Sequence, residues 1–239
     1  MQVDPRTLQS YSERLYQNQG NPELLTRLQC TSGWVLDVGC GAGDNARLLG
    51  EACEALRIVG ITASPNEASI ARKHMQNCLV ADIENEVPSE LEPNSFDCIL
   101  FSHVLEHLRE PSRVLASFVP YLKQGGQVLI AVPNIANFRS RWELVMGQFE
   151  YQETGVFDET HLRFFTYHSA DQFLLRDVTG LELVEKAVTG SVPLWAFRRY
   201  FFPNSLRQYL DRKGCRLFPN IFGGQVILNL INRPVVSME

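Results

Sequence analysis

The sequence predicts an α/β protein with a doubly wound, mostly parallel sheet of seven strands, an antiparallel edge strand and a helical, aromatic-rich cap. Three observations lead to this prediction. Short apolar runs alternate with helical stretches between residues 31 and 133, which is the rhythm of strands joined by helical crossovers. A glycine-rich turn directly follows the first apolar run. Two further apolar runs come late in the chain, on either side of an aromatic segment.

Each strand is recognised as an apolar run bounded by turn residues. The expected strands are Trp34–Val38, Arg57–Ile61, Cys78–Ala81, Phe96–Phe101, Gln127–Val132, Leu181–Val188 and Gln225–Ile231. The expected helices or helical turns are Asn45–Ala55, Pro65–Met75, Val104–His107, Ser112–Leu122 and Ser169–Asp177. We expect Gly125 and Gly126 to cap the end of the fourth of these helices. The last two strands are expected to pair as an antiparallel hairpin at one edge of the sheet.

The chain is expected to form one main domain, 31–239, preceded by helices within 1–30 that pack on an edge of the core. Two segments interrupt the alternating pattern. Residues 134–168 are too long for a plain connection and are rich in aromatics, which predicts an insertion over the strand ends. Residues 191–222 contain six basic residues and a single acid, which predicts a helical cap, a substrate lid or a contact with a membrane surface.

The composition restricts the classes of partner. The chain has 239 residues and a formal net charge of −5, which argues against a nucleic-acid partner because such binding depends on neutralising phosphates. No run approaches the roughly 18 apolar residues of a membrane-spanning helix, and the first residues lack the apolar core of an export signal. We therefore expect a cytoplasmic monomer or homodimer with reduced cysteines.

The glycine-rich turn, residues 39–43, lies between the first strand and the first helix. Backbone can approach a ligand closely where Cβ atoms are absent, and ligands of open α/β sheets bind at strand ends. A dinucleotide fingerprint counted from Gly39 would need a small residue at position 44, where this chain has Asp44. A nicotinamide-dependent oxidoreductase is therefore disfavoured. The acids Asp37 and Asp44 suit a ligand with a cationic or hydroxyl-rich face.

The run from Leu36 to Gly43, LDVGCGAG, resembles the first motif of the class I S-adenosylmethionine-dependent methyltransferases. The resemblance is clear over residues 31–133 and looser beyond them. It implies a Rossmann-like fold and S-adenosylmethionine as the cofactor. In that family the glycine turn lies against the methionine and ribose portion of the cofactor, and the acid before the turn belongs to the same site.

Two further strand ends match the family in part. Thr62 stands where the family commonly has an acid for the ribose hydroxyls, and Glu67 could supply the missing acceptor. Asp82 and Ile83 match the residues that accept from the adenine amino group and cover its ring; an aspartate there is also a common turn former. The resemblance assigns cofactor binding to Asp37, Gly39, Cys40, Gly41, Gly43, Thr62, Glu67, Asp82, Ile83 and Ser102.

The fourth strand runs into a segment rich in candidate catalytic groups. His103, Glu106 and His107 are spaced i, i+3 and i+4, which predicts a shared helical face. Because imidazole accepts protons near neutral pH, we expect His107 or His161 to act as general base, with His103 close to the transferred methyl group.

The segment also has a metal-binding likeness. The run that ends in His107 resembles the VLEH segment of many small-molecule methyltransferases, which commonly occurs without a metal. It is also similar to ubiquinone-pathway O-methyltransferases and RNA 3′-end 2′-O-methyltransferases, in which Glu-x-x-Glu-His and a later His bind a divalent ion. His103 replaces the first of those glutamates, so we expect no metal and keep Glu106, His107 and His161 as secondary candidates. A structural alternative is that Glu106 and His107 cap a helix and pair with Arg163.

Residues 158–166 resemble the D-x-THLRFFT signature of a bacterial methyltransferase branch associated with glycans and secondary metabolites. If this stretch is extended, His161 and Arg163 share one face toward the cleft, and Leu162 and Phe164 share the other toward the core. A purely structural hairpin is the alternative.

The sequence thus predicts methyl transfer from S-adenosylmethionine to an oxygen, hydroxyl or carboxylate, of a small molecule such as a sugar, glycan precursor or secondary metabolite. The aromatics of 134–168 and 191–222 predict a bulky, partly apolar acceptor beneath them. A carboxylate acceptor would need no base. The alternatives are N-methylation of a small molecule and a catalytically silent cofactor-binding or scaffold protein.

Overall fold

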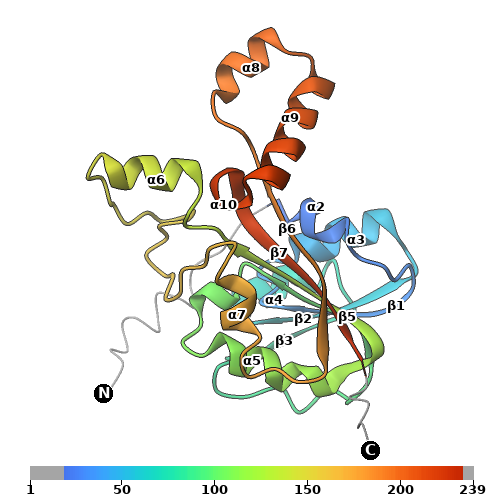
Figure 1. Ribbon diagram of the computed structural model, residues 1–239. Helices are drawn as coiled ribbons and strands as arrows, with labels where there is room; N and C mark the ends of the chain where they lie inside the picture. The colour runs from blue at the N-terminus through green and yellow to red at the C-terminus, as the bar shows by residue number, and fades with distance from the viewer. Residues whose placement is uncertain (1–18, 234–239) are drawn as a thin grey trace, which may run out of the picture.

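The computed structural model describes residues 19–233, without the side chains of residues 195 and 196. Its centre is a seven-stranded sheet with the order β3-β2-β1-β4-β5-β7-β6 (Figure 1). The strands are β1 (Gly33–Val38), β2 (Leu56–Thr62), β3 (Asn77–Val80), β4 (Phe96–Ser102), β5 (Leu122–Pro133), β6 (Leu181–Gly190) and β7 (Gly223–Asn232). Strands β1 to β5 are parallel, and β7 pairs antiparallel with both β5 and β6. The predicted fold class is confirmed, including the antiparallel pair at one edge.

Helices cover both faces of the sheet, which explains why the central strands are apolar on both sides. One core cluster joins the sheet to α5 (Pro111–Phe118) and α7 (Ala170–Leu174). The other joins it to α2 (Pro22–Leu25), α3 (Asp44–Ala52) and α4 (Pro65–Ala71). The remaining helices are α6 (Phe138–Val145), α8 (Trp195–Phe201), α9 (Asn204–Leu217), α10 (Pro219–Phe222), and the 3₁₀ turns η1 (Leu105–His107) and η2 (Val119–Tyr121).

Several boundaries differ from the sequence prediction. The helix expected over Ser112–Leu122 ends at Phe118, and β5 begins at Leu122, before the glycines that were expected to cap the helix. Leu122 already pairs with Phe96 of β4, and the register shifts before Cys98, so the glycines belong to an irregular part of the strand. Helices α3 and α4 are shorter than predicted and end at Ala52 and Ala71. The helices expected within 1–18 lie outside the described residues.

The two segments that interrupt the alternating pattern project from the body of the molecule (Figure 1). In 134–168, the expectation for the apolar pair was wrong: Leu162 and Phe164 are 50% and 42% exposed, and the neighbouring Phe165 enters the core instead. The chain is irregular there, so strand alternation does not apply. In 191–222, the buried Arg198 guanidinium donates to the Asp211 carboxylate at 2.8 Å and ties α8 to α9.

Within residues 19–233, no helix is both long enough and apolar enough to cross a membrane.

Two glycines near the ends of α3 provide a matched test of backbone packing. Gly43 has a φ of +87°, and a Cβ atom there would lie 3.0 Å from the Ala71 Cα. Gly50 lies within the helix, and a Cβ atom there would meet nothing within 4 Å. We expect Gly43→Ala to lower the free energy of unfolding by about 1–3 kcal/mol. Gly50→Ala should raise it by about 0.5–1 kcal/mol. Urea unfolding measures both, and equal effects would contradict this packing.

Candidate functional site

The strand order reverses between β1 and β4, and ligands of such sheets bind at this point, beyond the carboxyl ends of the strands. Asp37 lies near the carboxyl end of β1 and is 1% exposed. Neither of its carboxylate oxygens has a hydrogen-bond partner among the described residues. Burial raises the pKa of Asp37 to about 7, although the nearby Asn45 side chain opposes the rise. A buried carboxylate of this kind is destabilised until a donor or cation reaches it.

The glycine turn after β1 requires left-handed backbone. Gly39, Gly41 and Gly43 have φ values of 72°, 53° and 87°. A Cβ atom on Gly39 would lie 2.3 Å from the side chain of Val104, so this glycine also admits a close contact between the turn and the segment after β4. Cys40 is buried, with its Sγ atom 3.6 Å from that of Cys78 and no disulfide between them.

The end of β2 carries a buried polar pair. The Thr62 hydroxyl donates to the Glu67 carboxylate at 2.7 Å, and both residues are about 5% exposed or less. Ser64 caps α4 by accepting from the Glu67 backbone N–H, which fixes the first turn of that helix. The structure therefore brings Glu67 to Thr62, the two residues to which the sequence analysis assigned the ribose hydroxyls.

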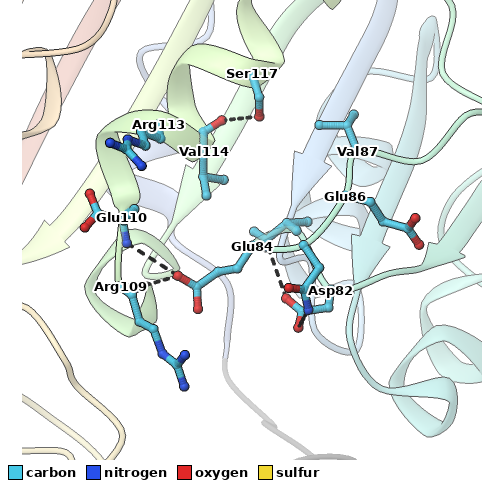
Figure 2. A pocket seen from close by; sticks show the side chains of 11 residues that line it. Asp82, Glu84, Glu86, Val87, Arg109, Glu110, Arg113, Val114 and Ser117 are labelled. Atoms are coloured by element: carbon cyan, nitrogen blue, oxygen red, sulfur yellow. Dashed lines mark hydrogen bonds between the residues drawn. The ribbon is translucent and has the colours of Figure 1, made fainter. Parts of the chain in front are cut away.

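The end of β3 leads into the wall of a cavity of about 680 Å³, formed by residues 82–87 and 109–117 (Figure 2). Asp82 and Ile83 both line it. The Asp82 carboxylate accepts from the Glu84 backbone N–H at 3.0 Å and from the Asn85 amide at 2.7 Å, so it forms a turn. Glu84 reaches across the cavity and accepts from the Arg109 backbone N–H at 2.6 Å (Figure 2).

His103 and Ser102 lie at the end of β4, but the predicted helical face is wrong. The helical turn contains only Leu105–His107, and His103 stands before it with a left-handed φ of 57°. His103 nevertheless contacts Glu106, because its Nδ1 atom lies 3.2 Å from a carboxylate oxygen. Burial would lower the pKa of His103, but the Glu106 carboxylate and Gln225 raise it above its usual value.

Glu106 is completely buried and joins several parts of the site. Its backbone carbonyl accepts from the N–H groups of Leu162 and Arg163, both at 2.9 Å. Its Oε2 atom has no hydrogen-bond partner among the described residues. The Arg163 guanidinium donates to the Arg109 carbonyl, so the predicted pairing of its side chain with Glu106 is not found.

His107 and His161 form an edge-to-face ring pair with centroids 4.8 Å apart. The Thr160 hydroxyl lies 2.9 Å from His107 Nδ1 and 2.6 Å from the Asp158 carboxylate, which positions the His107 ring. His161 Nδ1 lies 3.1 Å from the Val156 carbonyl. Burial lowers the pKa of His107, Glu106 opposes this, and His161 lowers it further, so the ring is neutral near pH 7.

The donor atoms of Glu106, His107 and His161 lie within 4.8 Å of one another. The two candidate bases and the secondary metal candidates of the sequence analysis therefore form one cluster, which joins the end of β4 to the 134–168 segment. The chemistry of this donor set would also accept a divalent ion.

Sequence analysis missed three residues that connect His103 to the antiparallel edge. His103 Nε2 lies 2.8 Å from the Gln225 side-chain oxygen, and the Gln225 amide donates to the Thr189 hydroxyl at 2.8 Å. Asn21 exchanges hydrogen bonds with the same amide. Thr189 lines a second cavity, of about 860 Å³, between α2, β6 and α9. The sequence signal that could have identified Gln225 is a polar residue near the start of an otherwise apolar strand.

The chain is similar to known proteins over part of its length. Residues 36–130 match the methyltransferase domain family. The chain is 30% identical over 115 residues to a ubiquinone biosynthesis O-methyltransferase of Xanthomonas euvesicatoria, covering 46% of each. It is 27% identical over 159 residues to an uncharacterized 37.1 kDa protein of a Streptomyces fradiae transposon, covering 64% of this chain and 41% of the other. The chain thus spans less than half the length of these relatives.

Solved structures share the fold at low identity. A Haloferax volcanii methyltransferase in complex with the Trm112 activator superposes with a TM-score of 0.62 at 17% identity, covering 96% of this chain and 95% of the other. An S-adenosylmethionine-dependent methyltransferase from Archaeoglobus fulgidus gives 0.58 at 17% identity, covering 84% and 86%. The cyclase SpnF gives 0.58 at 19% identity, covering 89% and 79%.

Residues 36–130 therefore form a methyltransferase domain, and the chain has the fold of S-adenosylmethionine-dependent methyltransferases of known structure. The donor set fits that cofactor, because the unpartnered Asp37 carboxylate and the Thr62–Glu67 pair lie at the ends of neighbouring strands. A ligand with an ammonium group and ribose hydroxyls carries donors from which the Asp37 and Glu67 carboxylates can accept. These residues would hold the cofactor, and the cofactor would supply the methyl group.

The buried Asp37 carboxyl predicts a specific pH dependence of stability. Its native pKa is about 7 against 3.8 ordinarily, so between these values the native state holds a proton that the unfolded state has released. This group therefore destabilises cofactor-free protein as pH rises through that range, by roughly 1.4 kcal/mol per pKa unit at most. We expect Asp37→Asn to raise the unfolding free energy at pH 8 and to have little effect near pH 4.

Urea unfolding at both pH values checks this expectation. A substitution effect that is the same at pH 4 and pH 8 would show that the Asp37 carboxyl has a partner in solution.

Proposed function

We propose that this protein transfers the methyl group of S-adenosylmethionine to an oxygen of a small-molecule acceptor, such as a sugar, glycan precursor or secondary metabolite. The acceptor is bulky for a small molecule and partly apolar. The observation that carries the proposal is the His107–His161 pair, a cluster of imidazoles beside the end of β4. A neutral imidazole there can accept the proton of a hydroxyl group as the carbon–oxygen bond forms. The ubiquinone biosynthesis O-methyltransferases among the relatives support oxygen as the acceptor atom.

Each residue of the cluster has a proposed role. His107 is the general base, because burial keeps its pKa low and Thr160 orients its ring. His161 supports it across the ring contact, or takes the proton in its place. His103 lies close to the transfer point, and its contact with the Glu106 carboxylate raises its pKa.

The aromatic residues of 134–168 support a bulky acceptor. Phe164 lies edge-to-face with His161 at 6.3 Å, and Phe149 contacts both Tyr151 and Phe157. Aromatic side chains exposed next to a polar cluster suit a molecule with one apolar part and one reacting hydroxyl group.

A catalytically silent cofactor-binding protein is the second candidate. It is favoured by Thr62, which stands where a carboxylate commonly receives the ribose and whose hydroxyl already donates to Glu67. The cyclase SpnF has the same fold, and a fold does not determine a reaction. Cofactor binding and methyl transfer are therefore tested separately.

Cofactor binding is the first test, made by calorimetric titration with S-adenosylmethionine and S-adenosylhomocysteine. We expect both to bind, and we expect Gly41→Val to weaken binding by at least about tenfold, because a β-branched residue at a φ of 53° must move the turn. Gly50→Ala, outside the turn, serves as the control. Thermal unfolding of both variants separates a lost site from a lost fold. Unchanged affinity in Gly41→Val would contradict the site.

Proton transfer is tested by His107→Asn and His161→Asn, after screening hydroxyl acceptors with labelled cofactor. We expect His107→Asn to lower kcat/KM by about 100-fold or more with S-adenosylhomocysteine affinity unchanged, because only the base is lost. His168→Asn is the control, since His168 is exposed and outside the cluster. We expect full activity in a chelator; activity lost in chelator and restored by a divalent ion would assign Glu106, His107 and His161 to a metal instead.

A further inference from the structure

A large share of the exposed apolar side chains of the described residues lies on one projecting element, the arm formed by residues 194–218 (Figure 1). It contains α8 and α9. On α8, Phe197, Tyr200 and Phe201 are spaced i, i+3 and i+4, and they are 53%, 84% and 60% exposed. Leu194, just before this helix, is 73% exposed. The helix therefore presents its aromatic face to the outside.

Helix α9 also exposes a face that carries apolar residues. Leu206, Tyr209, Lys213 and Leu217 recur at i, i+3, i+7 and i+11, and form a stripe along one side of the helix. The three apolar members are 40%, 51% and 60% exposed. The Lys213 ammonium lies 5.7 Å from the Tyr209 ring centroid, so the stripe combines apolar surface with positive charge.

The outward orientation of both helices is fixed from within. Arg198 is 5% exposed; its guanidinium donates to Asp211 of α9 and to the Pro193 carbonyl. Cys215, on the opposite side of α9 from the stripe, is buried against the body. These buried contacts hold α8 and α9 in an orientation that leaves their apolar faces exposed to solvent.

The arm is also the basic part of an acidic protein. Residues 191–222 have six basic residues and one acid, a local charge of +5 in a chain of formal charge −5. Aromatic residues with lysine and arginine on one element are typical of helices that lie in the interface of an anionic membrane. An acidic body is repelled by the same surface, which would orient the molecule with the arm toward the lipid.

We propose that the arm docks on the surface of a bilayer containing anionic phospholipids. Phe197, Tyr200 and Phe201 enter the headgroup region, and Lys213 contacts lipid phosphates. A second copy of the chain is a poorer occupant, because a two-fold interface would bring the same basic residues face to face. This docking is independent of the acceptor and of methyl transfer.

Helix α6 is a second exposed apolar element. Trp142, Val145 and Met146 are 58%, 79% and 57% exposed. The strands that lead to α6 and to α8 end at the same edge of the sheet, since Pro133 and Thr189 both pair with Gln225 of β7. Two exposed apolar helices therefore leave the sheet at one place.

The experiment is co-sedimentation of the full chain with phosphatidylcholine vesicles, with and without phosphatidylglycerol. We expect binding to the anionic vesicles only, and weaker binding as salt is added. Lys213→Glu should weaken it by at least about fivefold, since each basic residue near an anionic surface contributes about fivefold. Phe197→Ser combined with Phe201→Ser should weaken it by about tenfold or more.

Lys73→Glu and Val184→Ser are the matched controls, because both positions are exposed and lie outside the arm. They should bind vesicles as the unchanged protein does. S-adenosylhomocysteine binding and thermal unfolding of every variant show that the fold is intact. Three outcomes would overturn the proposal: no binding to anionic vesicles, binding that ignores lipid charge, or an intact arm double variant that binds fully. Sedimentation showing a dimer that Phe197→Ser with Phe201→Ser dissociates, without vesicle binding, would assign the arm to a second copy.

Discussion

The arrangement of the site depends on the burial of Glu106 at the end of β4. Its carbonyl group accepts two N–H groups from the 134–168 segment, and its carboxylate holds His103. These bonds bring a segment more than fifty residues away in the chain onto the sheet, and His161 with it. A buried carboxylate is expensive unless its oxygens are satisfied, and one of them has no partner among the described residues. The free energy of folding thus maintains a polar cluster where an apolar contact would be more stable, as is typical of functional sites.

The antiparallel strand β7 gives the site its second boundary. By entering between β5 and β6, it brings Gln225 to the edge where the parallel strands end, within 2.8 Å of His103. Asn134, at the exit of β5, is fully buried and donates to the Gly223 carbonyl at 2.7 Å. The base of the 134–168 segment is therefore held by amide hydrogen bonds whose direction is fixed, which positions the segment more precisely than apolar packing would.

The sequence predicts the parts of this structure that depend on local patterns. Apolar runs identify every strand, because helices cover both faces of the sheet and leave few polar positions. The glycine turn is recognisable since its three left-handed residues need glycine. Prediction fails where distant contacts decide. The left-handed backbone of His103 and the extension of β5 back to Leu122 depend on hydrogen bonds with other strands. The exposure of Leu162 and Phe164 could not be predicted, because alternation applies only to regular strands.

The core buries its apolar side chains, whereas the arm leaves apolar side chains exposed. Burial of the core stabilises the fold, yet Phe197, Tyr200 and Phe201 of the arm are more than half exposed to water. Each square ångström of apolar surface left unburied forgoes roughly 25 cal/mol of stabilisation. The Arg198–Asp211 pair keeps them there, so their exposure is built into the fold. Helices α6 and α8 follow β5 and β6, whose ends both pair with Gln225 of β7, so the arm and the segment that carries His161 leave the sheet at one edge.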